Sequence, residues 1–226
     1  MTHWGMNQDR SDKLRISLES VIETTEHLPV EIIIFDNGDN IEDSKYLLEL
    51  CHEGKVQFYT RSSSNLYFGF GRNSGIDLAC GDYLVFSDND IEYSPGWLDK
   101  CIKILKTFPD RKIAVTPLKT DRQHRQEKYW KEWFELDGER FPANNKAGSN
   151  SWVMRSKDFK NVGRFRNHHI AGSHWTDKFV NAGYTMVTME SEPLAQDLAF
   201  KQGYQIKMKA NIRRKFTNGE ELSIND

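Results

Sequence analysis

The stretch Gly81-Asp82-Tyr83-Leu84-Val85-Phe86-Ser87-Asp88-Asn89-Asp90 joins a short apolar run to two carboxylates that lie one residue apart. The run from Tyr83 to Phe86 is bulky and apolar, as a strand buried on both faces requires. Carboxylates at the end of such a strand are costly unless they are paired or bind a cation, and Mg²⁺ and Mn²⁺ are commonly held by one or two carboxylates plus phosphate oxygens. We therefore predict that Asp88 and Asp90 hold a divalent cation. The alternative is a simple turn, since Asp and Asn are ordinary turn residues.

The composition is that of a soluble globular protein of one domain, or of one domain with a smaller lobe. The chain has 226 residues, of which 38% are hydrophobic and 28% charged, and its net charge is −2. A charge so close to zero gives no indication of nucleic acid or of an anionic membrane surface as a partner.

The three cysteines, at positions 51, 80 and 101, are odd in number and widely spaced. They form neither a disulfide framework nor a metal-ligand pattern, which favours a reducing compartment. No signal peptide or transmembrane segment is recognisable. We therefore expect a cytoplasmic protein and leave open a peripheral association with a membrane.

Strands and helices alternate along the first half of the chain. Strands are expected over 30–35, 56–60, 83–86 and 113–116, and helices over 12–25, 44–51, 71–80 and from Pro95 onward. This alternation predicts an α/β fold in which a mostly parallel central sheet carries helices on both faces. Because ligands of such sheets bind at the carboxyl ends of the strands, Asp36 is expected at the same edge as Asp88.

The second half of the chain has a weaker pattern. Between Leu118 and Lys146 it is highly charged and carries an aromatic group around Trp130 and Trp133, for which we favour a solvated helix over a partly ordered cover. Further strands are expected over 148–155 and 184–189 and a helix over 173–181, with a turn-rich segment over 158–165. Because the first four residues run directly into a polar loop, we expect either a very short first strand or a trimmed amino terminus.

The order of motifs in the first half resembles that of family 2 glycosyltransferases. The run from Asn65 to Ile76 contains an Asn, a Gly-rich turn and an Asn-x-Gly helix, and a Gly-Asp-Tyr strand and a closing Asp-x-Asp follow it. The resemblance covers roughly residues 14–117, and 148–184 resembles the acceptor half less closely. It implies the GT-A fold with a Rossmann-like sheet, in which residues 1–117 form the nucleotide-sugar-binding half and 118–226 the acceptor-binding half of one domain.

The resemblance and the side-chain chemistry together place a donor site at the strand ends. Gly69 and Gly71 are expected to form a tight turn near the ligand, and Arg72 offers a planar fork to phosphate. The amide of Asn73 suits a base edge or a backbone carbonyl, and the family places an Asp such as Asp36 at the nucleobase, commonly uracil. The expected donor contacts are Thr2, Trp4, Asp36, Asn65, Gly69, Arg72, Asn73, Asp88 and Asn89, and the expected ligands of Mn²⁺ or Mg²⁺ are Asp88 and Asp90.

Each of these assignments has a structural alternative. Arg72 would make a surface ion pair, and Asp36 would close an Asx turn with Gly38. Asn73 and Gly75 would cap a helix and allow it to pack closely. The sequence leaves these alternatives open.

The chain departs from the family where a catalytic carboxylate is expected. Many members carry Glu-Asp at the start of the helix before Ala-Gly-Tyr, whereas this chain has Ala171-Gly172 at that place. A general base must lie within hydrogen-bond reach of the acceptor hydroxyl. The nearby candidates are, in order, Asp177, His174 and His169, because the family uses a carboxylate and histidine titrates near neutrality.

The sequence therefore predicts an inverting, metal-dependent, hexosyl-type glycosyltransferase. The donor would be a nucleotide-diphosphate sugar, UDP-linked by preference, and the acceptor a hydroxyl of a saccharide or a lipid-linked molecule. The Gln-x-x-Arg-Trp signature of processive synthases is absent, which favours transfer of a single sugar. Two alternatives remain: a protein that binds nucleotide sugars without turnover, and a nucleotidyltransferase with a similar sheet.

Overall fold

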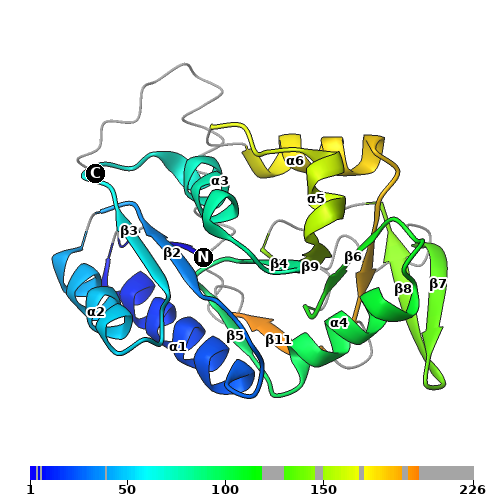
Figure 1. The fold of residues 1–226 in the computed structure, drawn as a ribbon, viewed down its shortest axis with the longest axis horizontal. Coiled ribbons are helices and arrows are strands. Elements are labelled where there is room, and N and C mark those ends of the chain that lie inside the picture. The colour runs from blue at the N-terminus through cyan, green and yellow to red at the C-terminus, as the bar shows by residue number, and fades with distance from the viewer. Residues whose placement is uncertain are drawn as a thin grey trace. The chain divides into compact units, whose positions relative to one another are not determined.

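The computed structural model in Figure 1 describes residues 1–3, 5, 7–38, 40–118, 130–145, 150–167, 171–189 and 193–198. Residues up to Gln196 form one compact unit, and a second unit begins at Asp197. The predicted division of the chain at residue 117 stays a prediction.

A small parallel sheet is built from the amino-terminal part of the chain. Its strands lie in the order β1 (Thr2–His3), β2 (Ile33–Asp36) and β3 (Phe58–Arg61), and the first strand is very short. The helices α1 (Gln8–Thr25) and α2 (Ile41–His52) supply its apolar core, in which Leu14, Leu18, Ile34 and Leu47 are fully buried. The side chains of Asn7 and Asn40 cap the two helices by accepting bonds from backbone N–H groups.

A larger mixed sheet follows. Its strands lie in the order β4 (Tyr83–Ser87), β9 (Ser151–Arg155), β6 (Ile113–Thr116), β10 (Thr185–Thr188), β8 (Glu139–Asn144) and β7 (Trp130–Leu136). Among the described pairs of neighbouring strands in this sheet, only β6 and β10 are parallel, because β9 enters between β4 and β6 in the opposite direction and β7–β8 is a hairpin. Short β5 (Ile91–Tyr93) pairs with β11 (Ala195–Asp197). The predicted α/β class is confirmed, but the larger sheet is mixed instead of mostly parallel.

Helices lie on both sides of the sheets, as predicted. In Figure 1, α3 (Tyr67–Leu78), α5 (Ser156–Val162) and α6 (Ala171–Asn181) lie on one side, and α1, α2 and α4 (Trp97–Thr107) on the other. Stacked aromatic rings fix the first group to the large sheet. The ring of Trp152 on β9 stacks on that of Trp175 on α6 at a centroid distance of 4.5 Å, and on that of Phe86 on β4 at 4.1 Å.

Three local predictions are wrong. The aromatic segment forms the β7–β8 hairpin instead of a helix, because Asp137 and Gly138 both adopt positive φ and close a two-residue turn. The segment expected to be turn-rich contains α5. Helix α3 already begins at Tyr67, so Gly69 and Gly71 lie within a helix and form no turn.

Candidate functional site

The carboxyl ends of β1, β2 and β4 meet at one edge. His3 pairs with Asp36 across the β1–β2 ladder, and Thr2 forms a parallel bridge with Asp88 just beyond β4. Asp36 and Asp88 therefore flank the short first strand, and the loop Asp88-Asn89-Asp90 starts beside them. This arrangement arises because parallel strands present their carboxyl ends together.

The acidic loop carries a negative charge that the protein only partly compensates. The Oδ1 atom of Asp88 accepts a hydrogen bond of 2.6 Å from Arg72, and the Asp88 side chain is 39% exposed. Burial, reinforced by the charge of Asp88, raises the pKa of Asp90 to about 6, although Arg10 and Lys13 act in the opposite direction. Burial and the neighbouring charge of Asp88 disfavour the ionised form of Asp90, and a cation bound nearby would counteract both effects.

The donor set of this loop fits a hard divalent ion. Two carboxylates one residue apart are available, and within the described ranges no group of three or more His, Cys, Asp and Glu side chains is arranged to hold a metal. Mg²⁺ and Mn²⁺ commonly take one or two carboxylates and complete their coordination with water and phosphate oxygens, which matches this loop.

Replacing Asp90 by asparagine is expected to stabilise the metal-free protein, and more so at pH 7 than at pH 4. The folded-state pKa of about 6 exceeds the ordinary value of 3.8, so the folded chain binds this proton more tightly than the unfolded chain. The stability contributed by the protonated carboxyl is therefore present below pH 4 and is lost as the pH rises toward 6. Since one pKa unit corresponds to about 1.4 kcal/mol, the advantage of the variant grows by up to about 3 kcal/mol over this interval.

Urea unfolding in the presence of a chelator measures this difference. Asp82→Asn is the matched control, because it makes the same change at an exposed carboxylate directly before β4. A stability difference between Asp90→Asn and the parent that does not change with pH would contradict the assigned environment of Asp90.

Arg72 is buried instead of lying on the surface. Its guanidinium is surrounded by the rings of Phe68, Phe86 and Phe165, whose centroids lie 4.9, 5.7 and 5.3 Å away. These rings attract the positively charged guanidinium. Because Arg72 is buried, its ion pair with Asp88 is not the surface ion pair of the alternative interpretation, which is therefore wrong. The pairing with Asp88 thus holds the first carboxylate of the acidic loop in place from α3.

The Asn73 amide holds the backbone of Phe165, whose ring contacts the Arg72 guanidinium. Its Nδ2 donates to the carbonyl of Phe165 at 2.9 Å, and its Oδ1 accepts from the N–H of Phe165 at 3.0 Å. Both amide atoms thus bind the same backbone residue, in keeping with the packing role left open for Asn73. The sequence could not indicate this pairing, because the two residues are 92 positions apart.

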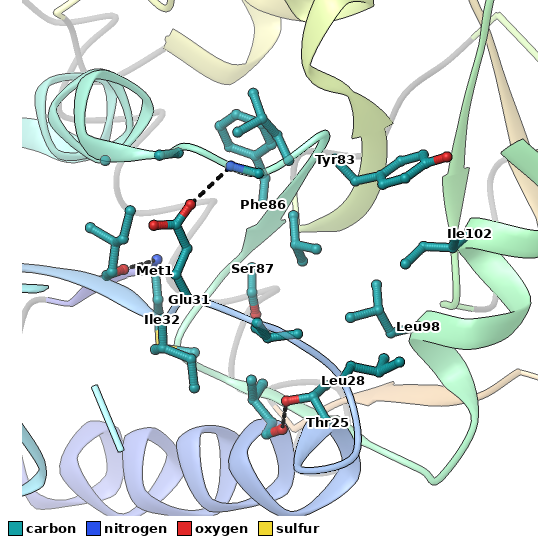
Figure 2. A pocket seen from close by; sticks show the side chains of 18 of the residues that line it. Met1, Thr25, Leu28, Glu31, Ile32, Tyr83, Phe86, Ser87, Leu98 and Ile102 are labelled. Carbon is teal, nitrogen blue, oxygen red and sulfur yellow. Dashed lines mark hydrogen bonds between the residues drawn. The ribbon is translucent and has the colours of Figure 1, made fainter. Parts of the chain in front are cut away.

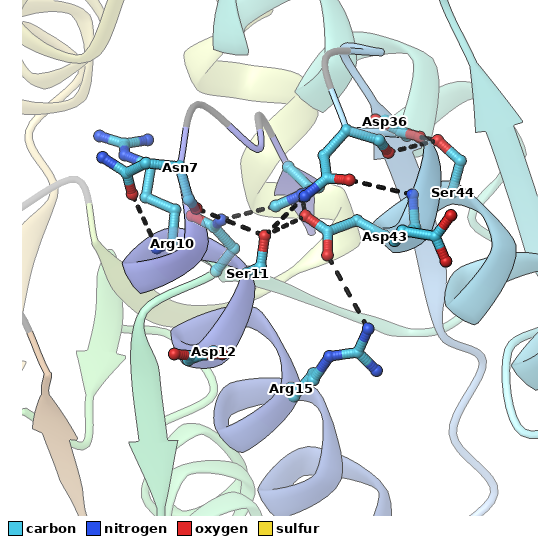
Figure 3. Close-up of polar contacts among 12 residues, drawn as sticks. Asn7, Arg10, Ser11, Asp12, Arg15, Asp36, Asp43 and Ser44 are labelled. Atoms are coloured by element: carbon cyan, nitrogen blue, oxygen red, sulfur yellow. Dashed lines mark hydrogen bonds and ion pairs between the residues drawn. The ribbon is translucent and has the colours of Figure 1, made fainter.

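A buried polar network of Ser11, Asp43 and His3 holds the side chain of Asn89. No local sequence pattern indicates this network. Asp43 accepts a bond of 2.7 Å from the Ser11 hydroxyl, as Figure 3 shows, and its Oδ2 lies 2.9 Å from His3 Nε2. The amide of Asn89 donates to His3 Nδ1 at 2.8 Å, so Nε2 carries the proton that faces Asp43. Burial lowers the pKa of His3, although the hydrogen bond and the charge of Asp43 act to raise it. A lowered pKa agrees with a neutral His3 ring that accepts from Asn89 and orients its amide.

Asp36 ends β2 and is 1% exposed. Its Oδ1 accepts from the N–H of Gly38 at 2.7 Å, and its Oδ2 accepts from the hydroxyls of Ser44 at 2.6 Å and Tyr59 at 2.9 Å. The predicted Asx turn with Gly38 is present. The carboxylate thus joins three elements of the fold, and its predicted role at the nucleobase stays a prediction.

The remaining predicted donor contacts lie around this edge. Thr2 packs against Gly71, where an added Cβ would come within 2.8 Å of Thr2 Cγ2 and of the Phe35 ring. The close approach of α3 to β1 and β2 thus depends on a glycine. Asn65 accepts from the N–H of Tyr67, which has a φ of 62° and begins α3. Trp4 lies outside the described residues.

The candidate bases are not brought to the strand ends by any described contact. Asp177 is exposed and lies on the face of α6 opposite to the buried Trp175 and Phe179. His174, one turn earlier, is half-buried. His169 lies outside the described residues. The assignment of a base in this segment therefore stays a prediction.

The fold and site together define an α/β chain whose acidic loop at the strand ends suits a cation and a phosphate group. The family model described as "Glycosyl transferase family 2" matches residues 7–171, and the chain belongs to that family. The predicted family is therefore confirmed.

Three solved structures share the fold at low sequence identity. The GalNAc-T7 complex with UDP, GalNAc and Mn²⁺ has 16% identity and a TM-score of 0.64 over 86% of this chain. The mannosyltransferase PcManGT from Pyrobaculum calidifontis, with GDP-Man and Mn²⁺, has 14% identity and a TM-score of 0.67 over 91%. TarS of S. aureus has 12% identity and a TM-score of 0.61 over 82%. These matches bear out the predicted GT-A class.

The chain spans 41%, 57% and 34% of the length of those three chains. In the part of the chain that the structure describes, no helix has the length and apolar character needed to cross a membrane.

Proposed function

We propose that the chain transfers one sugar from a nucleotide-diphosphate sugar to a hydroxyl of a saccharide or lipid-linked acceptor, with inversion at the anomeric carbon and with Mn²⁺ or Mg²⁺. The observation that carries this proposal is the position of the acidic loop Asp88-Asn89-Asp90 at the shared end of β1, β2 and β4 in a family 2 chain. Two of the similar structures contain nucleotides and Mn²⁺, which supports the choice of ligand.

Different residues of the chain have different proposed roles at the donor site. Asp90 and Asp88 would hold the cation, which when bound supplies a positive charge next to the leaving diphosphate. Arg72 fixes Asp88, and the His3–Asp43 pair fixes Asn89, so the loop is ordered before the donor arrives. The donor is proposed to be uridine-linked or guanosine-linked, because a carboxylate such as Asp36 accepts from the ring N–H that these bases carry.

A turnover assay with a panel of nucleotide sugars tests the proposed function. The protein is incubated with Mn²⁺ and each donor in the presence of mixed saccharide acceptors, and release of nucleoside diphosphate is measured. Release that requires the cation and is absent in Asp90→Asn supports the proposal. Formation of a nucleotide sugar from sugar phosphate and nucleoside triphosphate would show a nucleotidyltransferase instead.

A second candidate function, nucleotide-sugar binding without turnover, is favoured by Ala171-Gly172 and by the outward position of Asp177. Calorimetry combined with the turnover assay separates the two functions. A protein that only binds nucleotide sugars shows donor affinity in calorimetry but releases no nucleoside diphosphate in the turnover assay.

Asp177→Asn is expected to lower the turnover rate at saturating donor by about a hundredfold if Asp177 is the general base, with donor affinity retained. His174→Gln is the neighbouring comparison on the same helix, and the exposed Asp110→Asn controls for loss of surface charge. Parental rates for both α6 variants would place the base outside α6.

A further inference from the structure

The larger sheet ends in two different edges. Its first strand in spatial order is β4, which borders the cavity in Figure 2, where Ile32, Tyr83 and Phe86 are among the lining residues. That edge therefore faces another part of the same chain. The last strand is β7, at the right of Figure 1, and within the described residues it pairs with a strand on one side only, which is β8. An edge strand of this kind is a template for pairing with a strand of another molecule.

The turn of the β7–β8 hairpin determines which backbone groups of β7 point outward. Leu136 and Glu139 are paired directly next to the two-residue turn, so their N–H and C=O groups bond to each other. The direction of these groups alternates along a strand, and those of Phe134 therefore also point toward β8. The backbone groups of Trp133 and Glu135 consequently point away from the sheet, where a further strand would bind them.

The face of β7 that lies opposite to the buried Phe134 carries a tryptophan at its centre. Trp133 is 44% exposed, and the ring of Trp130 meets it edge to face at a centroid distance of 4.8 Å. The guanidinium of the exposed Arg140 on β8 lies 4.5 Å from the centroid of the Trp133 ring. Tryptophan and arginine are enriched among the residues that dominate protein interfaces. This composition favours a contact surface over a protected edge.

The charges beside Trp133 complement each other under a two-fold rotation. Lys131 lies two residues before Trp133 and Glu135 two residues after it, and both are exposed. When two copies of β7 pair antiparallel about Trp133, each Lys131 lies across from the partner's Glu135. The β7–β8 ladder shifts beside Lys131, so this residue contributes its long side chain, and the regular backbone ladder begins at Glu132. Opposite charges directly across a strand pair stabilise it, and like charges destabilise it.

Other registers of the same antiparallel pair are less favourable. A pair centred on Glu135 sets two glutamates against each other, and a pair centred on Lys131 sets two lysines against each other. Centres at Phe134 and Glu132 place the Trp133 ring across from a glutamate and from a lysine, respectively. Only the centre at Trp133 brings the two tryptophans together and opposes unlike charges on both sides of them. The sequence of β7 therefore specifies one register for pairing with itself.

We propose that β7 pairs antiparallel with β7 of a second copy of this chain about a two-fold axis at Trp133, so that two six-stranded sheets continue as one. Such an interface is isologous, because both copies contribute the same residues. A saccharide would also stack on an exposed tryptophan, but it matches neither the ladder spacing of the outward backbone groups nor the symmetric charges. A second copy is therefore the better occupant.

The position of β7 determines what the dimer leaves free. β4 and β7 are the two ends of the larger sheet, so the acidic loop beyond β4 stays open, and the dimer does not depend on the proposed function. One strand pair is small compared with the interface of a permanent dimer, and the dissociation constant is therefore expected on the order of 10–100 μM.

Sedimentation velocity of the full chain, over concentrations on both sides of this value, tests the proposal by exchange of charges. The parent chain is expected to dimerise reversibly. Lys131→Glu and Glu135→Lys each set like charges against each other on both sides of Trp133, and each is expected to weaken association about tenfold or more. An equal mixture of the two variants is expected to associate again, because every glutamate then faces a lysine of the other chain. Lys160→Glu, at an exposed lysine of α5, is the control and is expected to associate as the parent does.

Association that returns in the mixture cannot result from misfolding of the single variants, so this arm tests the register itself. A parent chain that stays monomeric at every concentration would overturn the proposal. So would a mixture that associates no better than either variant alone, because a dimer of the parent would then use another surface. A final arm adds mixed oligosaccharides to the parent. A change in tryptophan fluorescence that is lost in Trp133→Ser, in a chain that stays monomeric, would assign this face to a saccharide instead.

Discussion

Asp90→Asn is expected to abolish metal-dependent binding of a nucleoside diphosphate while the protein stays folded. Asparagine keeps the size of the side chain but removes the charge that the acidic loop offers to a cation. With one of two carboxylates lost, the affinity in the presence of Mn²⁺ is expected to fall by about a hundredfold or more. Calorimetric titration with uridine diphosphate, with and without Mn²⁺, measures the loss.

The same substitution is expected to raise the stability at neutral pH, since it removes a carboxyl whose pKa the fold raises to about 6. If Asp90→Asn is more stable than the parent but binds the nucleotide more weakly, the loss of binding cannot result from unfolding. Such a combination is typical of a site where function opposes stability. Asp82→Asn again serves as the control. Unchanged Mn²⁺-dependent affinity in Asp90→Asn would remove Asp90 from the site.

Asp36→Ala is expected to destabilise the chain by about 3 kcal/mol or more. The substitution removes the acceptor of the buried Ser44 hydroxyl and of the half-buried Tyr59 hydroxyl and Gly38 N–H, and a buried group left unsatisfied costs about 1–3 kcal/mol. Asp36→Asn keeps one acceptor oxygen and is expected to lose less. Urea unfolding measures both variants, and a loss below about 1 kcal/mol in Asp36→Ala would contradict the hydrogen-bonding role.

The phenol of Tyr59 reports on Asp36 independently. Its pKa is raised to about 12, mainly by burial, with the Asp36 hydrogen bond and charge adding to the shift and the Ser44 bond opposing it. In Asp36→Asn this pKa is expected to fall, which absorbance titration detects. Nucleobase preference is then compared in this folded variant: uridine and guanosine diphosphates are expected to lose their advantage over adenosine diphosphate if Asp36 contacts the base.

Strand β4 and the two carboxylates that follow it were predictable because their sequence signals are local. A compact apolar run followed by Asp-x-Asp needs no knowledge of distant residues, and β4 begins and ends within one residue of its prediction. The β7–β8 hairpin was predictable in principle, since Asp137-Gly138 is a strong two-residue turn signal, but the aromatic spacing around it favoured a helix.

The residues that support the acidic loop were not predictable from one sequence. His3 reaches Asp43 across 40 positions and Asn89 across 86, and the Asn73 amide reaches Phe165 across 92. Such pairs have no local pattern, because only the packing of β1, α2 and α3 brings them together.

The central claim is that Asp88 and Asp90 hold a cation which also binds the diphosphate of the donor. Crystals of the protein grown with Mn²⁺ and uridine diphosphate test it most directly, through the anomalous signal of manganese. One manganese peak is expected within coordination distance of the Asp90 carboxylate and of phosphate oxygens, at the shared end of β1, β2 and β4. A diphosphate bound with its manganese away from the acidic loop would contradict it.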